Sequence, residues 1–343
     1  MKTHPAKVAS TLGLARYLGL SEWTVSRAIN GHPEVKAATR ERILRAMEEV
    51  GFRPNPVARG LSGKAMGIVG VCFGNAYSAV MIDKISLLDQ FLRDQQLRGI
   101  LSISPRDEES ELRILADFLH LRVDAIVLIQ SILSAVQLRK TLGSALCVHV
   151  DPRSQDILPS VSLDRLEAMH LIVNHLVGLG HRSMGTLGFS STNIARWKGL
   201  TETLKEHGLS PDRHLQVFEL EDQRAESYGE GIGLAKCALE AKKLPTAFIA
   251  LNDHIAAGAI QAFRDANYRI PQDISVVGFD NLTVGQHLRP TLTTIDQQPQ
   301  LLISHAGGLL LEQLGKSSGP SLGKNIKVEP RLIVRESTGP APR

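Results

Sequence analysis

Polar side chains follow several apolar runs in the body of the chain, at the point where each run ends. A single Asp or Asn at such a place could act only as a helix N-cap. Open parallel sheets, however, bind ligands beyond the carboxyl ends of their strands, so several such residues together favour a binding site. Carboxylate and guanidinium groups form paired hydrogen bonds with neighbouring hydroxyls, which predicts a sugar or polyol as the ligand. The candidate residues are Asn75, Asp164, Asn252, Asp253 and Asp280, together with Arg196 at the start of a helical segment.

Sequence motifs for catalysis, dinucleotide binding and metal binding are missing. No glycine-rich run follows a strand and opens a helix, and no Gly-x-Ser-x-Gly nucleophile motif occurs. His170, His175 and His181 are five and six residues apart, which does not place them on one helical face. We interpret His181 as a structural residue at the entry to a strand. We therefore expect a protein that is not an enzyme and that needs no metal or cofactor.

The overall composition is that of a globular protein. Hydrophobic residues make up 43% of the 343 residues and charged residues 22%. No apolar run approaches the roughly 20 residues that a membrane span requires. The chain starts without an apolar stretch behind its first basic residues, so we expect a cytoplasmic location and no membrane partner.

The basic residues are concentrated at the start of the chain. The first 64 residues contain eleven Lys or Arg and five Asp or Glu, whereas the whole chain contains 39 and 35. A small basic module joined to a slightly acidic body is typical of proteins that bind a polyanion through one end. A solvated basic surface is the alternative, and the charge alone does not decide between the two.

A helical hairpin is predicted in this basic module. A helix over 12–18 is followed by a turn at Gly19, and Ser21 is a natural N-cap for a second helix over 22–30. The spacing of Ala15, Gly19 and Val25 is typical of a helix-turn-helix, whose second helix enters the major groove of DNA. A third helix is predicted over 39–50. The segment 52–61 is too short to be a stable helix alone, so we expect a linker there that becomes helical only against a partner.

The body of the chain alternates apolar, β-rich runs with amphipathic helical stretches. Near-continuous apolar strands separated by helices predict a parallel sheet that is covered on both faces. Two sets of such units predict two doubly wound α/β lobes. The expected strands cover residues 68–73, 99–103, 125–129, 145–150, 185–189, 216–220, 246–251 and 274–279.

Three segments resemble the LacI/GalR family of bacterial transcriptional repressors: residues 24–31, 39–43 and 51–55. The resemblance continues through the chain to residues 330–340. It implies an N-terminal all-α helix-turn-helix domain (1–53), a hinge helix or linker (54–65) and a periplasmic-binding-protein-like effector and dimerisation domain (66–343). The N-lobe would cover about 66–163 and 291–324 and the C-lobe about 164–290 and 325–343. The chain would then cross between the lobes near Asp164, Pro290 and Lys324.

The same resemblance implies a set of DNA contacts. Glu22, Trp23 and Arg27 would meet base edges in the major groove, although a solvated charge at Glu22 and a surface aromatic at Trp23 are alternatives. Leu61 would insert between the central base pairs of a kinked duplex, unless it is an ordinary linker leucine. The remaining expected contacts, which position the backbone or cap the helix, are Ser21, Thr24, Ser26, Asn30, His32, Asn55 and Arg59.

The resemblance also implies an effector site. Asp164, Arg196, Asp253 and Asp280 match effector-contacting positions, Gln297 matches another, and Tyr77 could stack on a ring. Ala76 stands where the family has a proline, and Lys36 stands where a serine often caps the third helix. We expect a homodimer on operator DNA that responds to a sugar or sugar derivative, with a purine or nucleoside as the alternative ligand.

Overall fold

The computed structural model describes residues 10–29, 32–53, 65–74, 79–105, 107–152, 158–220, 227–316 and 324–342. The chain divides into two compact units, Met1–Gly67 and Ile68–Arg343. Each unit is described separately below. No helix among the described residues is both long and apolar enough to cross a membrane.

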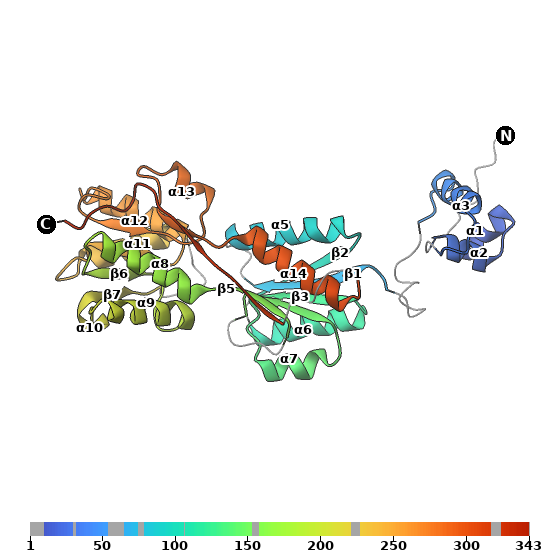
Figure 1. Cartoon of the computed structure of the whole chain (residues 1–343), viewed down its shortest axis with the longest axis horizontal. Helices are drawn as coiled ribbons and strands as arrows, with labels where there is room; N and C mark the ends of the chain where they lie inside the picture. Colours follow the sequence, from blue (N-terminus) through green and yellow to red (C-terminus); the bar gives the residue numbers. More distant parts are fainter. Residues whose placement is uncertain are drawn as a thin grey trace. The chain divides into compact units, whose positions relative to one another are not determined.

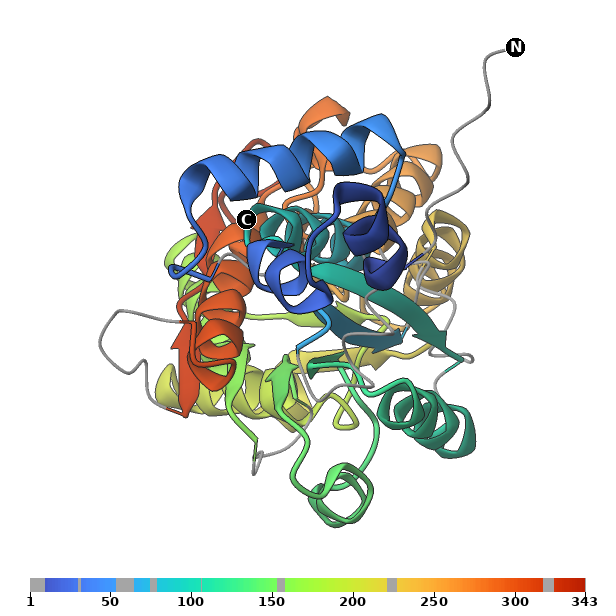
Figure 2. The same ribbon diagram turned by 90° about the vertical axis from the view of Figure 1, so that its right-hand side faces the viewer.

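The described residues of the first unit form three helices, α1 (Thr11–Leu18), α2 (Glu22–Ile29) and α3 (Ala37–Glu49). The three helices pack against one another (Figure 2). They enclose a small apolar core, which includes Leu14, Val25 and Ile43. Gly19 ends α1 in the left-handed conformation, with φ of 65°, as the turn between the helices requires. The predicted helical hairpin is therefore confirmed. Helix α3 begins two residues earlier than predicted, after Lys36, whose side chain makes no capping hydrogen bond.

The N-lobe of the second unit is a six-stranded parallel sheet in the order β11-β5-β4-β3-β1-β2. Helices α5 and α14 cover one face, and α6 and α7 cover the other (Figure 1). Residues that lie far apart in the sequence thus share one core. The elements are β1 (Ile68–Gly74), α5 (Ala79–Asp94), β2 (Arg98–Ser104), α6 (Glu108–His120), β3 (Ala125–Ile129), α7 (Ala135–Leu142), β4 (Cys147–Val150), β5 (Ser160–Leu163), α14 (Pro299–Gln313) and β11 (Asn325–Val328).

The C-lobe is a four-stranded parallel sheet in the order β7-β6-β8-β9. One apolar core lies between this sheet and α8 and α9, and another lies between the sheet and α11 and α12. The two doubly wound lobes predicted from the apolar pattern are therefore confirmed. The elements are α8 (Arg165–Gly178), β6 (Met184–Leu187), α9 (Ile194–Glu206), α10 (Pro211–His214), β7 (Leu215–Phe218), α11 (Tyr228–Leu239), β8 (Ala247–Ala250), α12 (Asp253–Asp265), β9 (Ser275–Val277) and α13 (Thr283–His287).

The chain passes between the lobes three times, and two of these crossings lie beyond the expected positions. The first crossing is at Asp164, between β5 and α8, as expected. The second follows β10 (Thr294–Asp296) rather than Pro290, because backbone bonds from Gly278 and Asp280 hold residues 293–295 in the C-lobe. The third follows β11 rather than Lys324, because β11 pairs with β5 of the N-lobe.

A two-stranded antiparallel sheet of β10 and β12 (Arg331–Ile333) lies beside these crossings (Figure 1). Strand β5 was not among the predicted strands. Strands β10, β11 and β12 were not among them either. Each has only three or four residues and includes charged or polar side chains. Their pairing partners lie far away in the sequence, so the local apolar pattern gives no signal for them.

His181 anchors the C-terminal segment to the C-lobe, which supports its predicted structural role. Its Nδ1 lies 2.9 Å from the Thr246 hydroxyl, and its Nε2 lies 3.0 Å from both the Ser275 hydroxyl and the Gly339 carbonyl. The side chain is fully buried, and burial lowers the pKa of His181 below its ordinary value. Burial also lowers the pKa of the nearby His175, which bonds to Thr338.

These two histidines predict a loss of stability in mild acid. The unfolded chain binds more protons than the folded one once the pH falls below the ordinary histidine pKa of about 6.5. The free energy of unfolding should therefore decrease from pH 7 to pH 5, with a slope of up to about 1.4 kcal/mol per pH unit for each histidine. Urea unfolding followed by Trp197 emission measures it. A His181→Gln variant should show a shallower dependence on pH, and an unchanged dependence would contradict this origin.

Candidate functional site

Helix α2 presents a polar face to solvent. The Ser21 hydroxyl accepts a hydrogen bond of 3.0 Å from the Thr24 backbone N–H, so Ser21 is the predicted N-cap. Val25 and Ala28 point into the core of the unit, which leaves Glu22 and Trp23 outside. The Trp23 side chain is 62% exposed, which is a large apolar area for an isolated surface position. This face has the exposure that a DNA-reading helix needs.

Arg27 is held in place by two neighbours on this face. Its guanidinium carbon lies 4.0 Å from the centre of the Trp23 ring, one helical turn earlier. The same guanidinium forms an ion pair with Glu34, which follows α2 in the sequence. Arg27 is therefore oriented before any ligand arrives, and contact with a base would exchange Glu34 for a base edge.

The other expected DNA contacts fall into two groups. Thr24 and Ser26 lie on α2, and His32 is half-buried, with its carbonyl accepting a 2.6 Å hydrogen bond from Arg40. Sequence reasoning did not predict this hydrogen bond from Arg40. The expected contacts that lie outside the described residues are Asn30, Asn55, Arg59 and Leu61.

In the second unit, polar residues with positive φ collect at the carboxyl ends of the strands. Among the described residues, eight residues other than glycine have positive φ, and five of them lie within four positions after the ends of strands β3, β4, β9 and β10. Such conformations cost on the order of 1–3 kcal/mol each and tend to cluster at functional sites. The conformation of Asp280, with φ of 125°, is the least usual for an L-residue. The five residues are Gln130, Asp151, Asp280, Asn281 and Gln298.

Asp280 is a buried carboxyl group that is protonated more easily than an ordinary one. Burial, followed by the negative charge of Asp253, raises the pKa of Asp280 to about 8. Arg196, Gln297 and Lys84 act in the opposite direction. The Gln297 amide donates a hydrogen bond to Asp280 Oδ1. At neutral pH the group can therefore donate as well as accept a hydrogen bond, which suits a hydroxylated ligand.

Arg196 and Asp253 of the C-lobe both interact electrostatically with Asp280, and Asn252 precedes Asp253 in the sequence. The Arg196 guanidinium lies 3.7 Å from the centre of the Phe279 ring and donates a 2.6 Å bond to the Leu251 carbonyl. Asn252 caps α12 by accepting a 2.9 Å hydrogen bond from the Ile255 N–H.

Asp253 already has two donors within the protein. Its carboxylate accepts 2.6 Å bonds from the Thr294 hydroxyl and the Leu282 N–H. Burial raises its pKa to about 6 despite these bonds. The ideal Cβ of an alanine at Gly278 would come within 2.2 Å of Asp253 Oδ1, so glycine is needed there for close approach. Asp253 therefore ties the start of α12 to β10 and to the segment after β9.

Asp164 has a different environment from the rest of the predicted effector residues. It caps α8 by accepting a 3.2 Å hydrogen bond from the Glu167 N–H, and it pairs with Lys327 at 3.0 Å. Burial would raise the pKa of Asp164, but the Lys327 and backbone hydrogen bonds lower it. None of its hydrogen bonds among the described residues reaches Asp280 or Gln297. Asn75 and Tyr77 lie outside the described residues.

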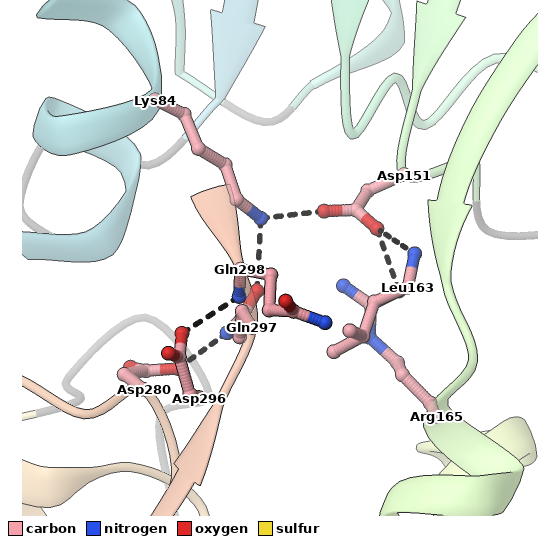
Figure 3. Close-up of polar contacts among 8 residues, drawn as sticks. All are labelled: Lys84, Asp151, Leu163, Arg165, Asp280, Asp296, Gln297 and Gln298. Carbon is pink, nitrogen blue, oxygen red and sulfur yellow. Dashed lines mark hydrogen bonds and ion pairs between the residues drawn. The ribbon is translucent and has the colours of Figure 1, made fainter. Parts of the chain in front are cut away.

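A buried charge network joins the two lobes, and sequence reasoning missed three of its members (Figure 3). The Lys84 ammonium of α5 donates to Asp151 at 2.6 Å and to Gln297 at 2.9 Å. Asp151 also accepts from Arg165 at 2.9 Å and from the Leu163 N–H at 3.1 Å. Burial would raise the pKa of Asp151, but the charges of Arg165 and Lys84 hold it well below its ordinary value. We call Lys84, Asp151, Arg165, Gln297 and Asp280 the junction network.

Two signals in the sequence could have identified the missed residues. Asp151 follows the apolar run 147–150, just as Asp280 follows Phe279. Lys84 shares a helical face with Val80, Leu88 and other buried residues of α5, so a charge is predicted inside the protein there. Among the described residues, no group of three or more His, Cys, Asp or Glu side chains could hold a metal ion.

Two family models match the chain. Residues 13–55 match the model described as bacterial regulatory proteins, lacI family. Residues 173–338 match the model of a periplasmic binding protein-like domain. The first match covers the helical unit and the second covers most of the C-lobe.

Curated relatives are similar over nearly the whole chain. Catabolite control protein A of Priestia megaterium is 29% identical over 95% of this chain and 98% of its own length. The HTH-type transcriptional regulator DegA of Bacillus subtilis (strain 168) is 26% identical over 95% of this chain and 97% of its own length.

Solved structures share the fold. A lac repressor dimer bound to operator and the anti-inducer ONPF superposes with a TM-score of 0.83 at 25% identity, covering 97% of this chain and all of that one. The transcriptional regulator CelR in its cellobiose complex superposes with a TM-score of 0.67 at 22% identity, over 97% of this chain and all of that one. With both units matched, the chain resembles the lacI family of bacterial regulatory proteins along nearly its whole length, and the curated relatives named above are transcriptional regulators.

Proposed function

We propose that this protein is a repressor that binds a pseudo-palindromic operator as a homodimer. A small sugar-like effector would raise or lower its affinity for the operator. The observation that carries the proposal is the junction network, because a buried polar network between two lobes lies in the same chain as a DNA-reading helix. A ligand that favours one arrangement of the lobes over another can shift the DNA affinity, with a coupling of about 1–3 kcal/mol in typical cases.

The proposed reading of DNA depends on the exposed face of α2. Glu22, Trp23 and Arg27 would supply base contacts, while Ser21, Thr24 and Ser26 would position the backbone. Because Arg27 is already stacked on Trp23, it loses little side-chain freedom on binding, which supports a specific contact with guanine.

The proposed effector site lies at the strand ends around Asp280. Asp280, Arg196 and Gln297 would contact the ligand, and Asp253 and Asn252 would hold the surrounding backbone. Carboxyl, guanidinium and amide groups together can satisfy the alternating donors and acceptors of a sugar. The similar solved structures include one regulator in complex with cellobiose, which is consistent with a carbohydrate effector.

The proposed dimer surface is the edge of the N-lobe sheet at β2. Strand β2 pairs with β1 on one side only, and Leu101 and Ile103 are 46% and 56% exposed. The opposite edge, β11, instead exposes Asn325 and Lys327, which discourage pairing with another sheet. An apolar edge strand on a soluble protein favours association with a second copy.

The function is tested by selecting bound duplexes from a random DNA pool and repeating the selection with added metabolites. The proposal expects enriched sequences with inverted half-sites, and retention that changes with a sugar or sugar derivative. A nucleoside that alters retention would favour the purine alternative. No sequence preference with any metabolite would contradict the proposal.

Replacing Trp23 by alanine should weaken binding to the selected operator by about tenfold or more, as expected for loss of a base contact. Binding to unrelated duplex DNA should stay nearly unchanged, because the substitution removes no charge. Fluorescence anisotropy at one fixed salt concentration measures both affinities. Leu44→Ala, at an exposed apolar position of α3, is the control. Equal losses on the two DNAs would exclude base reading by Trp23.

Replacing Ile103 by glutamate should convert the dimer to a monomer at micromolar concentration, because a charge would be buried at the apolar edge. Analytical ultracentrifugation measures the mass. The matched control is Val136→Glu on α7, where the side chain is 76% exposed and lies away from β2. A dimer that survives Ile103→Glu as well as the control would place the interface elsewhere.

Replacing Asp280 by glycine should stabilise the protein while abolishing the effector response. Glycine relieves the positive φ and removes a buried carboxyl, which we expect to raise the free energy of unfolding by about 1–2 kcal/mol. Urea unfolding followed by Trp197 emission and DNA retention with the selected metabolite measure the two effects. Asp280→Asn keeps the backbone strain and serves as the control. A destabilised or still responsive glycine variant would refute this role.

A further inference from the structure

The Lys84 ammonium is a donor that has no acceptor capacity. It is fully buried, and it contacts Asp151 Oδ2 at 2.6 Å and Gln297 Oε1 at 2.9 Å. An NH₂ group facing this ammonium would set two donors against each other at a buried position, where such a mismatch is costly. The side-chain oxygen of Gln297 must therefore face Lys84.

This orientation decides what Gln297 offers on its other side. With its oxygen directed at Lys84, the amide NH₂ is directed at Asp280 and donates to Oδ1 (Figure 3). Asp280 Oδ1 is then committed as an acceptor, and Oδ2 is the oxygen left for a ligand. Without Lys84, the amide could rotate by half a turn, and its oxygen could accept a hydrogen bond from the protonated Asp280 carboxyl instead.

We propose that Lys84 is a positioning residue of the effector site, which orients the Gln297 amide and thereby fixes the hydrogen-bonding face that Asp280 presents. The N-lobe helix α5 thus controls the chemistry of a residue in the C-lobe. Lys84 acts through Gln297 and need not touch the ligand. The consequence for ligand choice rests on the proposed function, whereas the orientation itself does not.

An ion pair formed only for stability does not account for this arrangement. Asp151 already has Arg165 and the Leu163 N–H as partners. Buried ion pairs add little net stability, because the loss of hydration offsets the attraction. A second cation on Asp151 is therefore poorly explained by Asp151 alone. Lys84 differs from Arg165 in that it also contacts Gln297.

The charged groups around Asp280 come from four helices. Asp253 of α12 raises its pKa, while Arg196 of α9 and Lys84 of α5 lower it, and Arg165 of α8 interacts with it electrostatically. Loss of Lys84 removes one positive charge and also frees the Gln297 amide. Both changes favour the protonated carboxyl, so the titration midpoint of Asp280 should move to higher pH.

A double-mutant cycle separates the charge from the orientation. The four proteins are the wild type, Lys84→Met, Gln297→Met and the double variant, all full-length and without effector. Each is labelled with ¹³C at the aspartate carboxyl carbons, and the Asp280 signal is assigned from its loss in Asp280→Asn. The titration midpoint of this signal is then measured by NMR.

The proposal expects a clear dependence on the background. Lys84→Met should move the Asp280 midpoint about twice as far in the wild type as in the Gln297→Met protein, where only the charge is lost. Equal movements in the two backgrounds would show that Lys84 acts through space alone and would overturn the proposal.

A second measurement needs no substitution at Lys84 and covers the case in which Lys84→Met does not fold. In the wild type, the side-chain NH₂ signals of Gln297 should titrate with the same midpoint as the Asp280 carboxyl carbon. Gln297 signals that do not move at this midpoint would overturn the proposal. Neither experiment uses a metabolite, so failure to find an effector would count against the proposed function but not against this assignment.

Discussion

The buried Lys84–Asp151 pair is the constraint on which the junction between the lobes depends. A charge removed from water must be matched by partners in the protein, or the fold is destabilised by several kcal/mol. Lys84 meets this requirement with Asp151, which follows β4, and with Gln297 of the second crossing. Asp151 adds Arg165 and Leu163 from either side of the first crossing. Five groups on four separate segments are thereby held in one arrangement.

Such a network is better suited to specifying geometry than to adding stability. Replacing a buried ion pair by well-packed apolar residues is often neutral, whereas removing one partner is costly. Asp151 and Asp280 also occupy positive-φ conformations that favour glycine. A stretch of chain that carries buried charge and backbone strain together departs from the local rules that stabilise folds. Departures of this kind concentrate where a protein has a function to perform.

The sequence was informative wherever the physical cause was local. Gly19 and Ser21 lie within one turn of the helices that they end and begin, so the hairpin could be predicted from spacing. The apolar strands of both lobes were equally clear. The second crossing could not be placed, because backbone bonds from Gly278 to Thr293 decide it. The strand-end rule found Asp280 but was not applied to Asp151, where the same pattern occurs.

Lys84, which sequence reasoning missed, has partners that lie far along the chain. Lys84 and Gln297 are separated by 213 positions, and Lys84 and Asp151 by 67. A lysine on the apolar face of α5 predicts that a buried counter-charge exists, but it does not identify the residue that carries this charge. In our proposal, the hydrogen-bonding face of Asp280 is thus set by Lys84, and no local sequence pattern connects the two residues. In a two-lobed protein, this long-range dependence follows from three separate crossings. The side chains that contact one another at the junction lie on segments that meet only after folding.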